Sequence, residues 1–344
     1  MTAPATAHCG GHITLLFSID KSSTLTRSQG SRGAGFTIDH GVSVQGTLLM
    51  VNDQMQSTEM TGIQPDPKPK NKGPADSTVQ ISDMHGHLLE DPTLYLDFIQ
   101  ACRDATLLRD HEYLDVQVQL QCPVSQGFGM SAAGMVALGR LIHALTGRGQ
   151  PVQYEKIAHR IERQHGAGLG DVLGLSVGGV ELRTQPGAPG WPGEAVSFHI
   201  ESPVLLVWDA NEERHTASYI DDPMWQSTIT AAGETSVVAL RTGSWDASRW
   251  RDLLEQSRAF AEASGMLEEA VRANVYHAVL GAVQDAGMQA GVAARLCMLG
   301  SSVVVVPRRL DQPPSIKELE TLADGLRERG FSTMVTAVAP ITPR

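Results

Sequence analysis

The sequence predicts an α+β protein of two lobes, with the change from one lobe to the other near residues 185–203. Predicted strands and helices follow one another without the regular strand–helix–strand alternation of a parallel α/β fold. The segment Tyr113–Cys122 alternates apolar and polar side chains, which is typical of a strand with one buried face. A chain of 344 residues is long enough for two hydrophobic cores. We therefore place one domain at residues 1–190 and a second at residues 191–344.

In the first half of the chain, residues 61–77 contain four prolines and are predicted to form a loop, because proline fixes φ and donates no hydrogen bond. A glycine-rich connection is expected between the first two strands. The predicted elements are strands at His12–Ile19, Val42–Val51 and Val79–Ser82, a helix at Pro92–Ala105, the strand Tyr113–Cys122, helices at Met130–Thr146 and Val152–Gln164, and a strand at Val177–Arg183.

In the second half, residues 186–193 hold three prolines and three glycines and are predicted to form a surface turn. A buried strand and a helix-rich stretch follow it. The predicted elements are a strand at Val204–Trp208, helices at 216–240, 246–263 and 266–298 (the last broken near Gly287 and Gly291), a strand at Ser301–Val306, a helix at Ile316–Arg327 and a strand at Phe331–Val338.

Composition excludes several classes of protein. The net charge of −11 argues against general nucleic-acid binding, which needs a basic face. No run of 18 apolar residues exists, so no membrane span is expected, and the N-terminus lacks a signal-peptide pattern, which favours the cytoplasm. None of the four cysteines form a close pair, so we expect reduced thiols in or near the core. His85 and His87 have no third metal ligand nearby and are predicted to lie in a solvated turn.

A glycine-containing segment, Pro123–Gly134, leads from a predicted strand into a long alanine-rich helix. Such a loop places backbone N–H groups around an anion, and the helix N-terminus adds partial positive charge. Gly127 and Gly129 allow close approach of the main chain, and Ser131 stands where a hydroxyl caps the helix or faces a phosphate-bound metal. The segment predicts phosphate binding, with a tight strand-to-helix connection as the alternative. Neither a Walker loop nor a Rossmann fingerprint is present.

Pro123–Gly134 resembles the signature Pro-x-x-x-Gly-x-Gly-(Ser/Met)-Ser-x-(Ala/Gly) of the small-molecule kinases named after galactokinase, homoserine kinase, mevalonate kinase and phosphomevalonate kinase, the GHMP kinases. Cys9–Thr14 resembles the family's N-terminal Pro-Gly-His element, with glycine in place of the proline. Gly30–Gly35, Gly168–Val172 and Met298–Gly300 are similar to the archaeal pantoate kinases of this family. The resemblance extends in order over most of the chain.

The resemblance implies an N-terminal α+β lobe with the ATP-binding loop and a C-terminal α/β-plait lobe. It implies transfer of the γ-phosphoryl group of ATP to an alcohol, with ATP and Mg²⁺ as cofactors. In the pantoate kinases the alcohol is the 4-hydroxyl of pantoate, and the product feeds coenzyme A synthesis. Related kinases often pair, so the resemblance also allows a homodimer. The residues implied to bind ATP are Pro123, Gly127, Phe128, Gly129, Met130, Ser131, Ala132 and Ala133.

Two carboxylates are implied to complete the phosphoryl-transfer site. By the resemblance to mevalonate kinase, Asp171 takes the alcohol proton or orients the alcohol; a turn aspartate is the alternative. The same resemblance implies that Ser131 and Glu162 hold Mg²⁺, a hard cation that prefers oxygen ligands. For Glu162 the alternative is an exposed position on a helix face.

Three further residues are candidates for substrate binding. Pantoate carries a carboxylate, and Arg32 in the glycine-rich segment can grip a carboxylate with two parallel hydrogen bonds; a solvent-exposed loop arginine is the alternative. His12 matches the histidine of the N-terminal element and either contacts substrate or fixes a buried turn. Ser22, which follows the first predicted strand, is the third candidate.

Two other functions stay open from the sequence. One is the same chemistry on another small alcohol or hydroxy acid, such as mevalonate or homoserine. The other is a non-catalytic nucleotide-binding member of the fold. Asp171 favours an enzyme, because a protein that only binds nucleotide has no use for a proton acceptor.

Overall fold

The computed structural model describes residues 3–50, 76–211 and 222–341, and it builds them around two β-sheets. The larger sheet has seven strands in the order β4-β3-β5-β2-β6-β7, with β1 paired to β2 off this path. Among the strand pairings of the described residues in this sheet, only β3–β5 is parallel. The strands of this sheet are β1 (Ala5–Phe17), β2 (Gly33–Met50), β3 (Thr78–Ser82), β4 (Leu88–Leu89), β5 (Glu112–Leu120), β6 (Val180–Gln185) and β7 (Glu194–Phe198).

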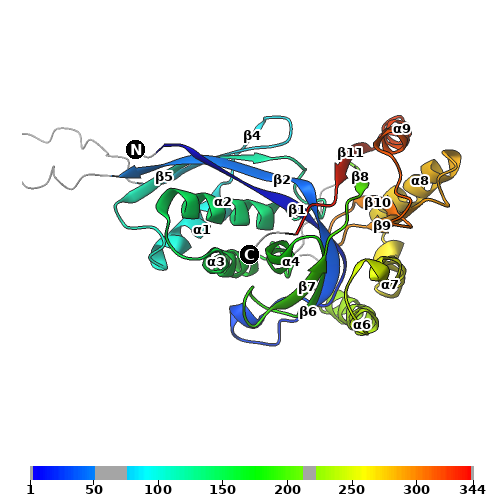
Figure 1. Ribbon diagram of the computed structural model, residues 1–344, viewed down its shortest axis with the longest axis horizontal. Helices are drawn as coiled ribbons and strands as arrows, with labels where there is room; N and C mark the ends of the chain where they lie inside the picture. Colours follow the sequence, from blue (N-terminus) through cyan, green and yellow to red (C-terminus); the bar gives the residue numbers. More distant parts are fainter. Residues whose placement is uncertain (1–2, 51–75, 212–221, 342–344) are drawn as a thin grey trace, which may run out of the picture.

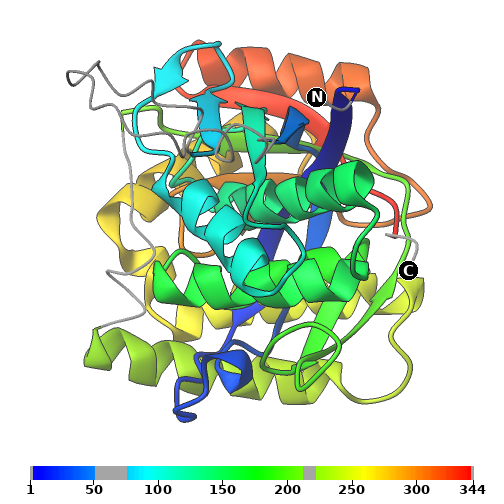
Figure 2. The same ribbon diagram turned by 90° about the vertical axis from the view of Figure 1, so that its left-hand side faces the viewer.

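Helices cover one face of the larger sheet (Figure 1). They are α1 (Thr93–Asp104), α2 (Met130–Thr146), α3 (Pro151–Gln164) and the short α4 (Asp171–Val177). Figure 2 shows α1, α2 and α3 side by side in front of the sheet. The central β5 alternates as the sequence predicts, with Leu114, Val116, Val118 and Leu120 buried. That buried row gives the helices an apolar surface to pack against.

The two longest strands, β1 and β2, carry glycines where a side chain would meet the main chain of the other strand. A Cβ at Gly10, Gly35 or Gly41 would stand 2.0–2.1 Å from a carbonyl oxygen of the facing strand. The register of the pair shifts at two places, between Gly10 and Gly11 and between Thr14 and Leu16. The bent ribbon brings residues 9–14 beside the glycine loop that follows β5.

The second sheet has four antiparallel strands in the order β11-β8-β10-β9. Its central strands are almost wholly apolar and buried, as in Val303–Val306. Helices gather around it at the far end of the molecule in Figure 1. The elements of this part are β8 (Pro203–Trp208), α6 (Pro223–Leu240), α7 (Trp250–Ala263), α8 (Ala270–Asp285), β9 (Val292–Leu296), β10 (Val303–Pro307), α9 (Ile316–Arg327) and β11 (Ser332–Ala337).

Main-chain hydrogen bonds join the two lobes. After β11 the chain returns to the larger sheet, where the N–H of Ala339 donates to the carbonyl of Thr37 at 2.8 Å. The N–H of Met298 donates to the carbonyl of Thr14, also at 2.8 Å. The change from one sheet to the other falls between Phe198 and Pro203, inside the predicted transition region. The predicted division at residue 190 lies before β7, which still belongs to the larger sheet.

The predicted α+β class with two lobes is confirmed, and several local predictions are wrong. The expected connection at Gly30–Gly35 is partly strand, because β2 begins at Gly33 rather than at Val42. The strand expected from Val177 begins at Val180, after the unpredicted helix α4. The end of the helix predicted at 266–298 is instead strand β9. Strand β7 was not predicted. Most of the proline-rich loop at 61–77, the end of the strand Val42–Val51 and the start of the helix predicted at 216–240 lie outside the described residues.

Two further local predictions, on the cysteines and on the turn at His85 and His87, hold. All four cysteines are buried and unpaired. His85 and His87 are exposed in a turn, where Asp83 accepts the N–H groups of both residues. Within residues 3–50, 76–211 and 222–341, no helix is long and apolar enough to cross a membrane.

The packing of α2 generates a stability prediction. Gly134 lies where an added Cβ would stand 2.1 Å from the hydroxyl of the buried Tyr95. Gly134→Ala is therefore expected to lower the free energy of unfolding by about 1–3 kcal/mol despite the helix propensity of alanine. Gly325 in α9 has open space around it, so Gly325→Ala is expected to add roughly 0.5–1 kcal/mol. Urea denaturation measures both, and equal effects of the two changes would contradict this packing.

Candidate active site

The loop between β5 and α2 ends with the N-terminus of α2 facing a cavity. Gly127 and Gly129 have φ angles of +81° and +67°, a region that residues with side chains rarely adopt. Gly129 is the N-cap of α2, and its carbonyl accepts the N–H of Ala133 at 2.9 Å. The N–H groups of the three residues before Ala133 have no partner within the helix, so this end of α2 can receive an anion.

Segments from both lobes hold this phosphate loop, residues 123–129, in shape. On one side, the N–H of His12 donates to the carbonyl of Phe128 at 2.9 Å, and a Cβ at Gly129 would stand 2.9 Å from the His12 Cβ. On the other side, the hydroxyl of Ser302 donates to the carbonyl of Gln126. The conformation of the loop therefore depends on contacts with β1 and with the second lobe.

The predicted ATP-binding residues lie along this loop and the first turn of α2. Phe128 packs its ring against Trp208, with centroids 5.7 Å apart, so it presents main chain rather than its ring to the cavity. Ala133 is outside the lining, because its N–H is already bonded within the helix. The predicted residues that line the cavity are Pro123, Gly127, Phe128, Gly129, Met130, Ser131 and Ala132.

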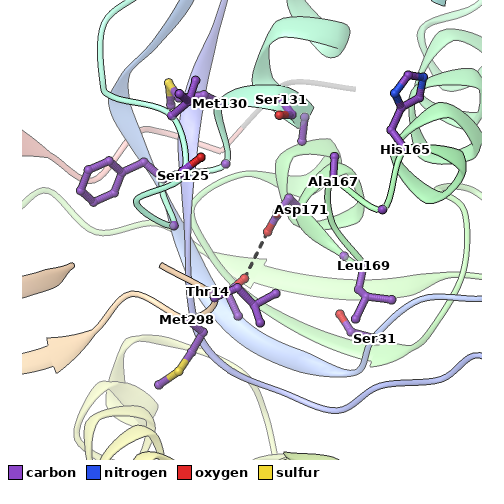
Figure 3. A pocket seen from close by; sticks show the side chains of 18 of the residues that line it. Thr14, Ser31, Ser125, Met130, Ser131, His165, Ala167, Leu169, Asp171 and Met298 are labelled. Atoms are coloured by element: carbon purple, nitrogen blue, oxygen red, sulfur yellow. Dashed lines mark hydrogen bonds between the residues drawn. The ribbon is translucent and has the colours of Figure 1, made fainter. Parts of the chain in front are cut away.

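The cavity has a volume of about 410 Å³ and lies between the phosphate loop, β1 and the N-terminus of α4. In Figure 3, Ser125 and Met130 lie on the loop side, Asp171 and Thr14 lie opposite them, and Met298 reaches the cavity from the second lobe. Gly129 and Asp171 thus share one cavity. A donor phosphate at the start of α2 and an acceptor at Asp171 would therefore occupy the same cavity, as a direct transfer requires.

Asp171 is the first residue of α4, and its side chain is 23% exposed at the cavity wall. Its Oδ1 accepts hydrogen bonds from His12 Nδ1 at 2.7 Å and from the hydroxyl of Thr14 at 3.2 Å. Burial works to raise the pKa of this carboxyl. The hydrogen bond and charge of His12, with Arg183 and the Thr14 hydroxyl, outweigh burial and hold that pKa below its usual range.

His12 is fully buried between two carboxylates. Its Nδ1 faces Asp171, and its Nε2 lies 3.1 Å from Glu181 Oε1. Burial lowers the pKa of the imidazole, but the Glu181 charge and the hydrogen bonds to both carboxylates raise it overall to about 9. At neutral pH the ring is therefore an imidazolium, the form in which both nitrogens donate hydrogen bonds.

Glu162 is buried, with 1% of its surface exposed, so it does not lie on an exposed helix face. Its Oε2 has no hydrogen-bond partner, and a Cβ at Gly168 would stand within 3.0 Å of both Glu162 Oε1 and Asp171 Oδ2. Burial, followed by the charge of Asp171, raises the pKa of Glu162 to about 8. A buried carboxylate oxygen without a partner beside a second carboxylate fits a bound divalent cation.

No group of three or more His, Cys, Asp or Glu side chains in the described parts of the chain is arranged to hold a metal ion. Ser131 is partly exposed in the cavity lining, and Glu162 lies outside the lining, next to Gly168 and near Asp171. Such a set suits Mg²⁺, which commonly keeps several waters and is bound through one or two carboxylates together with substrate phosphates.

None of the three predicted substrate residues, His12, Arg32 and Ser22, is among the residues that line the cavity. The guanidinium of Arg32 pairs with Glu234 at 3.0 Å and is 29% exposed. Ser22 is exposed, and its hydroxyl donates to Asp20 at 2.8 Å. Neither geometry supports a carboxylate-binding role in this cavity.

Further polar residues line the cavity, among them Thr14, Ser31 and Arg183. Arg183 is 1% exposed, its NH1 donates to Glu181 at 3.0 Å, and its Nε has no partner. The sequence contained a signal for it, because Glu181 and Arg183 are two charged residues on one face of a predicted strand between apolar neighbours. Thr14 and Ser31 had no comparable signal.

Comparisons with known proteins agree with this geometry. The GHMP kinases N terminal domain matches residues 96–179, a span that includes the phosphate loop and Asp171. The chain is a small-molecule kinase, similar to the GHMP kinases. The kinase is 26% identical to the pantoate kinase of Methanospirillum hungatei, with 89% of this chain and 88% of the relative covered. It is 23% identical to the pantoate kinase of Methanocaldococcus jannaschii, with 92% and 94% covered.

Solved structures show that the kinase has the two-lobed GHMP fold. A structure described as a phosphotransferase related to the CoA biosynthesis pathway superposes with a TM-score of 0.73 at 19% identity, covering 99% of the kinase and 98% of that chain. Mevalonate kinase from methicillin-resistant Staphylococcus aureus superposes with a TM-score of 0.57 at 15% identity, covering 97% and 98%.

The buried imidazolium generates a pH prediction for the ligand-free kinase. Because the pKa of His12 is about 9 in the folded state and about 6.5 in an unfolded chain, its contribution is complete below pH 6.5 and is lost as pH rises through 9. The free energy of unfolding is expected to fall by on the order of 2–3 kcal/mol across this interval.

Urea titrations at several pH values measure this slope. The raised pKa of Glu162 also makes the free energy of unfolding fall as pH rises, between an unfolded pKa of about 4.3 and its folded pKa of about 8. A matched variant is therefore needed to isolate the contribution of His12. His12→Gln has no imidazole and should show a shallower decline. Parallel curves for the two proteins between pH 6.5 and 9.5 would rule out a titrating His12.

Proposed function

We propose that this kinase transfers the γ-phosphoryl group of ATP to the 4-hydroxyl of pantoate and so makes 4-phosphopantoate for coenzyme A synthesis. The pantoate kinases to which it is similar align over most of its length, and so does the phosphotransferase related to CoA biosynthesis. The observation that carries the proposal is Arg183, a buried cation with an unpartnered Nε in the wall of the cavity that holds Asp171. A cation and a carboxylate in one cavity suit an acceptor with both a carboxylate and a hydroxyl.

In the proposed reaction, the N–H groups at the start of α2 receive the ATP phosphates. Oδ1 of Asp171 is occupied by His12 and Thr14, so Oδ2 is the oxygen left to meet the acceptor hydroxyl. As the acceptor oxygen bonds to the γ-phosphorus and the bond to the ADP oxygen breaks, the hydroxyl proton passes to Asp171. The transition state is loose, so a carboxylate of lowered pKa is basic enough to take the proton late.

Mg²⁺ belongs to the same proposal. Glu162 and Ser131 would hold it, since they offer a carboxylate oxygen without a partner and a hydroxyl at the mouth of α2. When bound, Mg²⁺ neutralises charge on the ATP phosphates. The protein itself orients the phosphates by main-chain N–H groups and positions the acceptor between Asp171 and Arg183.

Some broader proposals rest on the sequence and the family. We place the protein in the cytoplasm and propose a homodimer as its assembly. We keep residues 1–190 and 191–344 as its proposed domains, although the last strand of the larger sheet ends slightly later, at Phe198. Light scattering coupled to gel filtration tests the assembly.

A coupled assay of ADP release tests the reaction itself. Purified kinase with Mg·ATP is expected to turn over pantoate faster than mevalonate or homoserine, the acceptors of the alternative reading. Faster turnover of either alternative would reassign the substrate. Absence of turnover with every acceptor, in protein that binds ATP, would instead favour a nucleotide-binding protein without catalysis.

Asp171→Asn tests the proposed proton acceptor. The amide keeps the shape of the side chain and loses the basic oxygen, so kcat is expected to fall by roughly 10²–10⁴-fold. ATP affinity, measured by calorimetry, should change little because the phosphate loop is untouched. Turnover equal to that of the unaltered kinase would remove Asp171 from the mechanism.

Arg183→Lys tests the proposed carboxylate site. Lysine keeps the charge but loses the planar fork, so the KM for pantoate is expected to rise by about tenfold or more with the KM for ATP nearly unchanged. Arg32→Lys is the matched control, because Arg32 pairs with Glu234 outside the cavity lining. If Arg32→Lys gives the larger rise, the carboxylate is bound where the sequence first suggested.

A further inference from the structure

Glu181 of β6 contacts both His12, which bonds to Asp171, and Arg183, which lines the cavity. The side chain is fully buried, and a single oxygen, Oε1, lies 3.1 Å from His12 Nε2 and 3.0 Å from Arg183 NH1. Its other oxygen, Oε2, is buried without a hydrogen-bond partner. His12 bonds to Oε1 through Nε2 and to Asp171 through Nδ1. Arg183 bonds to the same Oε1 and lines the wall of the cavity.

We propose that Glu181 is a positioning residue that sets the distance between the proton acceptor and the acceptor-binding arginine. One carboxylate oxygen of Glu181 holds both Nε2 of the His12 ring and Nη1 of the Arg183 guanidinium in place. Glu181 is the carboxylate within 4.0 Å of both His12 Nε2 and the Arg183 guanidinium, so removing its charge is expected to loosen both cations. The part of the inference that concerns the acceptor rests on the proposed function.

Comparison with another buried ion pair separates this role from simple stabilisation. Glu112 is 2% exposed and pairs with Arg148 through both of its oxygens, in the usual two-pronged arrangement. Glu181 instead divides one oxygen between cations from two strands and leaves Arg183 Nε unpartnered beside the cavity. A carboxylate placed only for stability would gain more from the arrangement that Glu112 adopts.

The charged groups near His12 define the first test, which needs no substrate. Asp171 from α4 and Glu181 from β6 contact its ring, Arg183 lies behind Glu181, and Glu162 from α3 lies near Asp171. In NMR titrations the His12 signal, assigned by its loss in His12→Gln, is expected to titrate near pH 9 in the unaltered kinase. In Glu181→Gln it should titrate at least about one unit lower, since one of its two anionic neighbours is gone.

The second test is kinetic. Glu181→Gln is expected to raise the KM for pantoate and to lower kcat, each by about tenfold or more, with the KM for ATP within about twofold. Glu112→Gln removes a comparably buried carboxylate outside the site, so it should lose stability while all three constants stay within about twofold. Glu181→Asp keeps the charge on a shorter side chain, so most of the His12 shift is expected to remain while the KM for pantoate rises; that rise is the readout if the amide variant does not fold.

The outcomes separate this inference from the proposed function. If the unaltered kinase does not phosphorylate pantoate, the proposed function fails and the NMR titration still decides the anchoring of His12. If His12 titrates at the same pH with and without the Glu181 charge, the inference is overturned. It is also overturned if pantoate is turned over and Glu181→Gln behaves kinetically like Glu112→Gln.

Discussion

The buried imidazolium of His12 is the contact on which the rest of the site depends. A charged ring with no exposed surface is stable only because carboxylates stand on both of its sides, Asp171 at 2.7 Å and Glu181 at 3.1 Å. These three residues come from β1, α4 and β6, so one ring ties together segments that are distant in the sequence. The main-chain N–H of the same residue bonds the phosphate loop at Phe128. The positions of the Asp171 carboxylate and of the glycine loop before α2 are therefore both tied to His12.

The second lobe contributes to the site mainly by shaping the loop. A Cβ at Gly300 would stand 2.0 Å from the carbonyl of Gln126, and a Cβ at Gly127 would stand 3.0–3.1 Å from the carbonyls of Cys297 and Met298. Arg272 donates through Nε to the carbonyl of Gly300 at 2.7 Å and so supports this turn from α8. A loop with two glycines in the left-handed region needs such external support, because glycine loses more freedom on ordering than other residues do.

The sequence predicted those parts of the molecule in which a local pattern and the tertiary environment agree. The alternation in Tyr113–Cys122 predicts a strand, and the glycines before α2 predict a loop that ends in a helix. Each pattern depends on a few adjacent residues, and these elements are present. Strand β9, Val292–Leu296, was missed because its alanines favour a helix locally, whereas its pairing with β10 decides its conformation. The first turn of α4 was not predicted, because the glycines next to it are typical of a loop.

The site was predictable only in part, for a similar reason. Asp171 is next to a glycine motif, and the structure puts it in the same cavity as the phosphate loop. Arg32 is also next to glycines, yet it pairs with Glu234, a residue of α6 that no local pattern connects to it. Arg183 reaches the cavity from a strand whose position in the sheet is set by pairing with β2 and β7. Contacts between distant segments therefore decide which of two arginines lines the cavity.

The most direct test is a crystal structure of the kinase with Mg²⁺, a non-hydrolysable ATP analogue and pantoate. The account predicts phosphate oxygens at the N–H groups of Met130 and Ser131, the 4-hydroxyl of pantoate at Asp171 Oδ2, and its carboxylate at Arg183. A nucleotide bound away from α2, or pantoate held with its hydroxyl turned from Asp171, would contradict it.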